Sequence, residues 1–225
     1  MSSENSRRTF LKGIGIGSVF LGSMQYTLSA SDEKVKSDKN PHYGMIFDQT
    51  KCVGCSDCEI ACTKVNFIPK GQHRLFVDDQ TDPLDVMHRR FVRISCQQCV
   101  DSPCTEVCPT NACYKDSITS IINMNTDDCI GCKYCIVACP YDVRFINSET
   151  KAAESCNFCL DTNLNNEKDP ACVEACKYDA MVFGDFNNEK SFMNKILNVK
   201  DSVRMKPNFG TKPSLRYIPA LKTGV

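Results

Sequence analysis

The chain has 225 residues, 42% of them hydrophobic and none of them tryptophan, and its 27 basic and 27 acidic side chains give a formal net charge of zero. This length is short of two ordinary domains. After residue 31 no stretch approaches 18 consecutive apolar residues, which excludes a membrane-spanning helix from that part of the chain. The unusual quantity is the number of cysteines, 17.

Residues 1–31 are predicted to be an export signal. Arg7 and Arg8 stand in a stretch, SRRTFLK, that matches the twin-arginine consensus, and a mildly apolar, glycine-rich segment follows it. Small residues at the end of that segment allow cleavage, and retention of the signal as an anchor stays open. The twin-arginine route accepts folded proteins, so it can export a protein whose cofactor must be assembled in the reducing cytoplasm. We expect a periplasmic protein, with residues 32–42 as a linker.

Beyond the linker, short strands, cysteine-rich loops and short helices alternate. Alternating apolar residues predict strands at residues 43–47, 74–77, 89–94, 118–125, 143–146 and 181–183. A short helix is expected at residues 59–65. The repeated rhythm predicts an α+β fold.

The C-terminal part carries no cysteine pattern. An amphipathic helix is expected after residue 187, with Phe192, Ile196 and Val199 on one side. Residues 206–225 contain three prolines and several apolar side chains, and are expected to run extended over the surface or onto a partner.

Sixteen of the cysteines form four quartets. Two quartets have the spacing C-x2-C-x2-C-x3-C, and they are Cys52, Cys55, Cys58, Cys62 and Cys129, Cys132, Cys135, Cys139. The other two are looser, and they are Cys96, Cys99, Cys104, Cys108 and Cys156, Cys159, Cys172, Cys176. Three cysteines on a tight loop can bind three corners of a cubane, while the fourth, on a helical turn, points to another cluster. This spacing predicts four [4Fe-4S] clusters.

Glycines support the same interpretation. In both strict quartets a glycine, Gly54 or Gly131, precedes the second cysteine, and glycine tolerates the positive φ and the close backbone approach that a cluster loop requires. An exported protein can form disulfides, but an odd cysteine count and cysteines two residues apart make poor staples. Zinc sites use C-x2-C pairs, but they leave the third and fourth cysteine of each quartet unexplained. A structural zinc protein stays as a distant alternative.

Charge argues against a nucleic-acid partner. Without residues 1–31, which contain three basic residues and one acidic residue, 24 basic and 26 acidic side chains remain. Each oxidised cubane with four thiolates adds about two negative charges, so the loaded protein should be strongly acidic. No nucleic acid is expected to bind.

The four quartets behind a twin-arginine signal resemble a family of four-cluster polyferredoxin subunits. It includes the iron–sulfur subunits of dimethyl sulfoxide, polysulfide and tetrathionate reductases, and the sequence resembles in particular the NrfC-like subunit of formate-dependent nitrite reduction. The likeness is strongest at residues 89–99, at residues 139–146 and at residues 210–213. Lys177 stands where relatives usually have proline.

The resemblance implies two bacterial-ferredoxin-like modules, each holding two clusters. The inner module, residues 96–147, would be nested within an outer module made of residues 43–95 and 148–186, and residues 187–225 would be a C-terminal helix and extended tail. It also implies crossed ligation, with the four clusters held by Cys52, Cys55, Cys58 and Cys176; by Cys156, Cys159, Cys172 and Cys62; by Cys96, Cys99, Cys104 and Cys139; and by Cys129, Cys132, Cys135 and Cys108.

The function implied is electron transfer. The sequence has no catalytic constellation of its own, and the resemblance implies an integral-membrane quinol-oxidising partner and a periplasmic reductase or multihaem cytochrome as acceptor. The protein would associate with the membrane peripherally, through a partner. A molybdopterin polysulfide, thiosulfate or tetrathionate reductase is the alternative acceptor.

The remaining candidate residues are assigned supporting roles. Cys113 is expected to be a buried thiol and not a ligand. Aromatic residues beside the ligands are expected to exclude water, and they are Tyr134, Tyr141, Phe158 and Tyr178. The histidines, His42, His73 and His88, are scattered, and no C-x-x-C-H motif for covalently bound haem occurs.

Overall fold

The computed structural model describes residues 40–85 and 89–220, so the predicted export signal and His88 lie outside the described residues. The helices are α1 (Asp57–Val65), α2 (Pro103–Glu106), α3 (Tyr134–Val137), α4 (Ala171–Glu174) and α5 (Phe192–Leu197), with 3-10 turns at Leu164–Asn166 and Pro207–Phe209. The strands are β1 (Tyr43–Asp48), β2 (Leu75–Asp79), β3 (Phe91–Ser95), β4 (Cys113–Lys115), β5 (Ile122–Met124), β6 (Phe145–Ile146), β7 (Ala153–Glu154), β8 (Met181–Asp185) and β9 (Leu215–Ile218). The mixed α+β class is confirmed.

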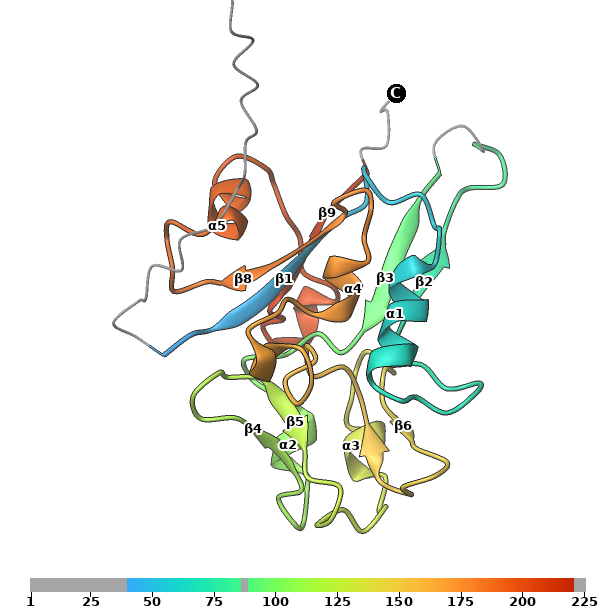
Figure 1. The fold of residues 1–225 in the computed structure, drawn as a ribbon, viewed down its shortest axis with the longest axis vertical. Helices are drawn as coiled ribbons and strands as arrows, with labels where there is room; N and C mark the ends of the chain where they lie inside the picture. The colour runs from blue at the N-terminus through green and yellow to red at the C-terminus, as the bar shows by residue number, and fades with distance from the viewer. Residues whose placement is uncertain (1–39, 86–88, 221–225) are drawn as a thin grey trace, which may run out of the picture. The chain divides into compact units, whose positions relative to one another are not determined.

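A three-stranded sheet with the order β8-β1-β9 forms one part of the fold (Figure 1). Its middle strand, β1, pairs antiparallel with β8 and parallel with β9. Met45, Ile46 and Phe47 of β1 are at most 1% exposed, because both faces of the strand are covered. Met45 and Phe47 pack among cysteines of the main core, whereas Ile46 packs against Met193 of α5.

Residues 211–220 are therefore part of the fold, and the expectation of an extended surface tail was wrong for them, whereas residues 206–210 are exposed. Leu215 is fully buried and Ile218 is 6% exposed in β9. Upstream of β9, the backbone amides of Val100 and Asp101 donate to the carbonyls of Lys212 and Thr211 at 3.1 and 3.2 Å. The segment thus binds both the central sheet and the loop that follows Cys99.

Of the side predicted to be apolar in helix α5, only Ile196 packs against the core, beside Met193. Phe192 is 53% exposed and Val199 is 86% exposed, whereas Met193 is fully buried. A β-carbon placed on Gly184 of β8 would lie 2.9 Å from the Cβ of Met193. Glycine at this position lets the helix lie directly on the strand, and one methionine fills the contact.

The other strands form three antiparallel hairpins, β2-β3, β4-β5 and β6-β7. The strand predicted at residues 118–125 is shorter than expected, since β5 covers only Ile122–Met124. The carboxylate of Asp116 accepts hydrogen bonds from the amides of Ile118 and Thr119 at 3.1 and 2.7 Å. This local side-chain bonding holds the backbone in a turn and competes with strand pairing there.

The four short helices pack in two pairs, α1 against α4 and α2 against α3 (Figure 1). In Figure 1, α4 lies beside the central sheet and α1 beside the β2-β3 hairpin, whereas α2 lies beside the β4-β5 hairpin and α3 beside β6. Segments more than a hundred residues apart therefore meet at α1 and α4. No helix in residues 40–85 and 89–220 is long and apolar enough to cross a membrane.

Candidate metal centres

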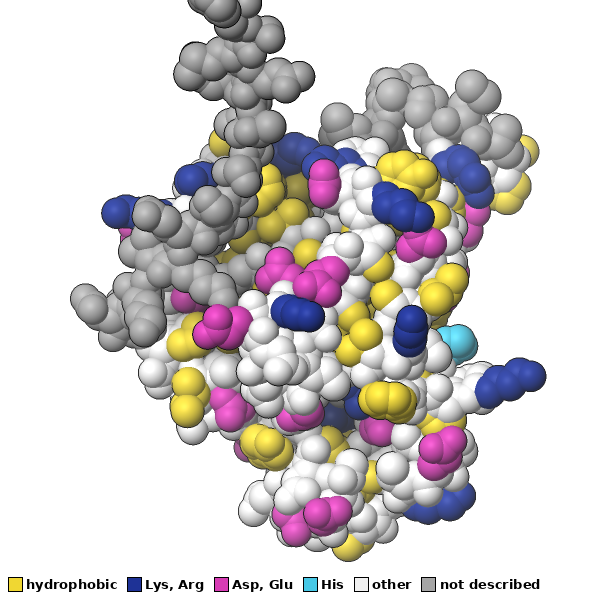
Figure 2. All heavy atoms as spheres, in the orientation of Figure 1, with side chains coloured by type: hydrophobic (Ala, Val, Ile, Leu, Met, Phe, Trp, Pro, Cys, Tyr) yellow, Lys and Arg dark blue, Asp and Glu magenta, His cyan; other side chains and the backbone are white. Residues whose placement is uncertain are grey.

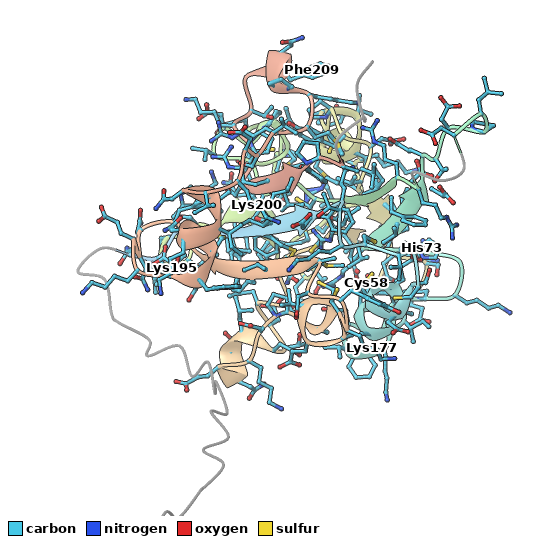
Figure 3. The ribbon with its side chains drawn as sticks, turned by 90° about the horizontal axis from the view of Figure 1, so that it is seen from above. Cys58, His73, Lys177, Lys195, Lys200 and Phe209 are labelled. Atoms are coloured by element: carbon cyan, nitrogen blue, oxygen red, sulfur yellow. The ribbon has the colours of Figure 1, made fainter. Side chains whose placement is uncertain are left out.

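Each quartet places its third cysteine on one of the paired helices. Cys58 lies on α1, Cys104 on α2, Cys135 on α3 and Cys172 on α4, and all four side chains are buried. Figure 3 shows Cys58 inside the molecule, whereas Lys177, which follows the fourth quartet, extends outward. The four quartets thus repeat one local structure in spite of their different spacings.

The turn between the first two cysteines also repeats. The residue before the second cysteine has positive φ in every quartet: 70° at Gly54, 49° at Gln98, 66° at Gly131 and 52° at Phe158. A β-carbon on Gly54 would lie 2.3 Å from the ring of Phe91, so this position also needs the space that glycine leaves. The prediction that Gly54 and Gly131 supply positive φ is confirmed.

The first quartet meets the last cysteine of the fourth quartet. One hollow is lined by Val77, Tyr178 and Met181 together with four cysteines, Cys52, Cys55, Cys58 and Cys176. Burial raises the pKa of the Cys58 thiol to about 12, and the nearby thiols of Cys176 and Cys52 act in the same direction against the guanidinium of Arg93. These four cysteines are one of the ligand sets that the resemblance implied.

The fourth quartet in turn meets the last cysteine of the first. Burial raises the pKa of Cys62, and its further electrostatic neighbours are the thiols of Cys156, Cys172 and Cys159. The side-chain amide of Asn66 lies 3.7 Å from the sulfur of Cys62 and 3.5 Å from that of Cys159.

In the inner quartets, too, the fourth cysteine of each quartet lies near cysteines of the other quartet. Burial raises the pKa of Cys99 to about 11, and the neighbouring thiols that raise it further are those of Cys104 and Cys139. Cys96 has Cys104 among its neighbours. Burial also raises the pKa of Cys135, whose neighbouring thiols include Cys108 and Cys129. Cys132 is exposed, and no contact places it with this set.

Neighbouring thiols also connect one set to the next. Cys58 of the first set is a neighbour of Cys172 in the second. Cys156 of the second set is a neighbour of Cys96 in the third, and Cys104 of the third is a neighbour of Cys135 in the fourth. Two of the quartet cysteines are exposed, Cys55 in the first set and Cys132, which belongs to the same quartet as Cys129 and Cys135.

Backbone and side-chain groups surround the thiols of the quartets. A zinc ion with zinc–sulfur distances near 2.3 Å would need thiolates about 3.8 Å apart. In the described part of the protein, no three Cys, His, Asp or Glu side chains are grouped so that they could hold one metal ion. Backbone amides donate to sulfurs of the quartet cysteines, from Cys113 to Cys108, from Ala153 to Cys129 and from Ala180 to Cys176, at 3.3 to 3.4 Å. Such bonds stabilise thiolates.

Two buried arginines lie among these cysteines. Arg93 of β3 is fully buried, and its Nη2 lies 3.8 and 3.9 Å from the sulfurs of Cys156 and Cys172. Arg144 is 6% exposed, and its two terminal nitrogens both lie 3.2 Å from the sulfur of Cys113. Arg93 Nε and Nη1 and Arg144 Nε have no hydrogen-bond partner among the described residues. Buried guanidinium groups with unpaired nitrogens fit a site whose negative charge comes from a bound group.

Comparison with known proteins decides the chemistry. The family described as the 4Fe-4S dicluster domain matches residues 87–186. Protein NrfC of Escherichia coli (strain K12) is 42% identical over 217 residues, which cover 95% of each protein. The B subunit of the polysulfide reductase of Wolinella succinogenes is 44% identical over 186 residues, 81% of this protein and 97% of that one. The thiosulfate reductase electron transfer subunit PhsB of Salmonella typhi is 43% identical over 145 residues, 63% of this protein and 75% of that one.

The protein belongs to this family of 4Fe-4S electron-transfer subunits. The family resemblance drawn from the cysteine quartets is confirmed, and the subunit binds [4Fe-4S] clusters as the relay component of an oxidoreductase system.

The supporting residues of the subunit follow the predictions in part. Cys113 is buried, at 1% exposed, as expected. Phe158 and Tyr141 are buried and can exclude water, whereas Tyr134 and Tyr178 are 60% and 48% exposed, and for these two the water-excluding role stays a prediction.

The histidines and Lys177 have structural surroundings. His42 Nε2 lies 3.0 Å from the Ser214 hydroxyl, and His73 is exposed (Figure 3). Lys177, the departure from the family pattern, pairs with Asp57 of α1 at 3.1 Å. This pair joins the two helices of the outer quartets at the surface.

Proposed function

We propose that the subunit is a periplasmic electron relay with four [4Fe-4S] clusters, one in each of the four cysteine sets. The ligands are the sixteen cysteines of the quartets in the crossed arrangement, and Cys113 is not a ligand. The inner and outer quartets then form two ferredoxin-like modules, the inner one nested in the outer, in keeping with the packing of α2 on α3 and of α1 on α4.

The observation that carries the proposal is the series of neighbouring thiols that joins the four sets, Cys58 to Cys172, Cys156 to Cys96 and Cys104 to Cys135. Clusters in adjoining sets would exchange electrons through a buried interior, and the exposed cysteine of each terminal set would bring a cluster close to the surface. Electrons can therefore enter at one end and leave at the other. The protein supplies binding, orientation and water exclusion, while the clusters supply the redox chemistry.

The surface beyond the clusters suits contact with other proteins. Exposed apolar side chains occur within five residues of both exposed cysteines in the sequence, Val53 and Ile60 around Cys55 and Ile130 and Val137 around Cys132. Figure 2 shows hydrophobic side chains mixed with charges of both signs on one face of the subunit. We propose a membrane quinol-oxidising subunit as the donor and a periplasmic nitrite reductase system as the acceptor, by analogy with NrfC.

A second acceptor is favoured by the likeness to the polysulfide reductase B subunit and to PhsB. In that case the partner is a molybdopterin reductase. Affinity purification of the subunit from anaerobic membranes separates the two, since a multihaem cytochrome in the complex supports the first acceptor and a molybdopterin subunit supports the second.

Iron and sulfide content test the cluster number. Protein purified without oxygen should contain about sixteen irons and sixteen sulfides per molecule, because each of the four cubanes contains four irons and four sulfides. The Cys113→Ser variant is the matched control and should retain the same content. A wild-type content of about eight irons, or zinc in their place, contradicts the proposal.

Export is tested on the arginine pair. Changing Arg7 and Arg8 together to lysine should leave cluster-loaded protein in the cytoplasm, because the export receptor reads the arginines and not merely their charge. The measurement is the distribution of subunit and iron between cytoplasmic and periplasmic fractions. A variant with Arg89 and Arg90 changed to lysine is the control and should be exported. Normal export of the first variant would refute the twin-arginine route.

A further inference from the structure

Arg93 lies between two of the cysteine sets. Its Nη2 is close to Cys156 and Cys172 of the second set, and Cys58 of the first set is also among its electrostatic neighbours. Tyr217 also lies beside Arg93, and its hydroxyl donates to the Arg93 carbonyl at 3.0 Å. The guanidinium is therefore held within the protein between the cysteines of the outer quartets.

Arg144 occupies the corresponding place among the inner quartets. Besides Cys113, its electrostatic neighbours are Cys104 and Cys96 of the third set and Cys135 of the fourth. The two arginines come from different parts of the sequence, β3 and the segment just before β6. Each of them nevertheless adjoins two sets that belong to one pair of quartets.

Neither arginine has a carboxylate partner among the described residues. The ion pairs there include Arg74 with Glu154 and Arg89 with Asp79, but none involves Arg93 or Arg144. Thiols do not neutralise a guanidinium unless they are ionised, and a buried cation without a counter-charge is strongly unfavourable. A bound cluster with thiolate ligands supplies the missing negative charge.

We propose that Arg93 and Arg144 are the internal counter-cations of the clusters, Arg93 for the outer pair and Arg144 for the inner pair, and that each raises the reduction potentials of both clusters beside it. This inference rests on the proposed cluster sites. Reduction adds one negative charge to a cluster, and a fixed cation in a poorly polarisable interior stabilises that charge more than it stabilises the oxidised state.

The test is a potentiometric titration of the whole loaded subunit, followed by EPR. In Arg93→Met, two clusters should show at least a tenfold lower ratio of reduced to oxidised cluster at a fixed ambient potential, a shift of about 59 mV for one electron. These should be the clusters whose signals are lost in Cys58→Ser and Cys62→Ser. In Arg144→Met, the other two clusters should shift.

Two further variants separate charge from packing. Arg93→Lys keeps the positive charge. It should shift the two reduction potentials by only a small fraction of the shift that Arg93→Met causes. Arg216→Met is the matched control, because Arg216 is half-buried on β9 with Phe186 beneath its guanidinium and no cysteine among its neighbours. It should leave all four potentials unchanged.

The inference is overturned if loaded Arg93→Met keeps wild-type potentials, or if the lysine variant shifts as far as the methionine variant. If Arg93→Met loses iron, the result for Arg93→Lys decides between charge and packing. Full iron content with wild-type potentials in Arg93→Lys supports the role of the positive charge. Iron loss in both variants refutes the inference. Failure of the proposed function would appear elsewhere, as a wild-type iron content that does not correspond to four clusters.

Discussion

Replacing Cys139 with serine is expected to destroy the cluster that Cys99 helps to hold and to spare the one that Cys132 helps to hold. Cys139 belongs to the same quartet as Cys132, but its thiol is a neighbour of Cys99. The expected loss is one cluster in four, about four of sixteen irons. The measurement is the EPR spectrum of reduced protein, together with iron content.

The experiment requires no prior assignment of the signals. Cys99→Ser and Cys132→Ser are made in parallel, and the signal missing from Cys139→Ser should be the one missing from Cys99→Ser. If it is instead the signal missing from Cys132→Ser, each strict quartet holds its own cluster and the crossed arrangement is wrong.

The cysteine spacing predicts most of the site, because a cubane imposes its geometry locally. Three ligands within seven residues need one tight loop, and the positive φ of Gly54 and Gly131 follows from the same requirement. The looser quartets hide this signal, since Gln98 and Phe158 adopt positive φ without being glycine. Their turn could not be predicted from residue type.

The packing that depends on distant segments was harder to predict. β9 pairs in parallel with β1, a strand some 170 residues earlier, and nothing in the local pattern of residues 206–225 encodes that partner. Helix α5 buries Met193 because Gly184 admits it, which the periodicity of Phe192, Ile196 and Val199 does not show. Both differences arise from contacts that form only when the protein folds.

The buried arginines also leave a signal in the sequence. Arg93 stands between Val92 and Ile94, and Arg144 between Val143 and Phe145, so each is a lone charge in an otherwise apolar run. A charge at a position where apolar residues are expected is unfavourable unless it has a partner. Near a cysteine quartet, that pattern indicates a cation facing the cluster.

Deleting residues 212–225 is expected to abolish assembly of the loaded subunit rather than release it from the membrane. The deletion removes β9, whose Leu215 is fully buried against Met45 and Phe47 in the main core. It also removes the Lys212 carbonyl that binds the loop after Cys99. The free energy lost with a strand of the central sheet exceeds the few kcal/mol of unfolding free energy that a domain can lose and remain folded.

A single substitution measures how much the packing of Leu215 in the main core contributes to stability. Leu215→Ala should cost about 2–5 kcal/mol, since it opens a cavity in the core, and should lower the thermal midpoint of the loaded protein by about 4–20 °C. Leu84→Ala is the control, because Leu84 is 97% exposed, and it should leave the midpoint unchanged. Deleting only residues 221–225 leaves β9 in place and should preserve iron content. If the longer deletion yields fully loaded protein in the soluble periplasmic fraction, β9 is dispensable and the C-terminal segment is a docking element instead.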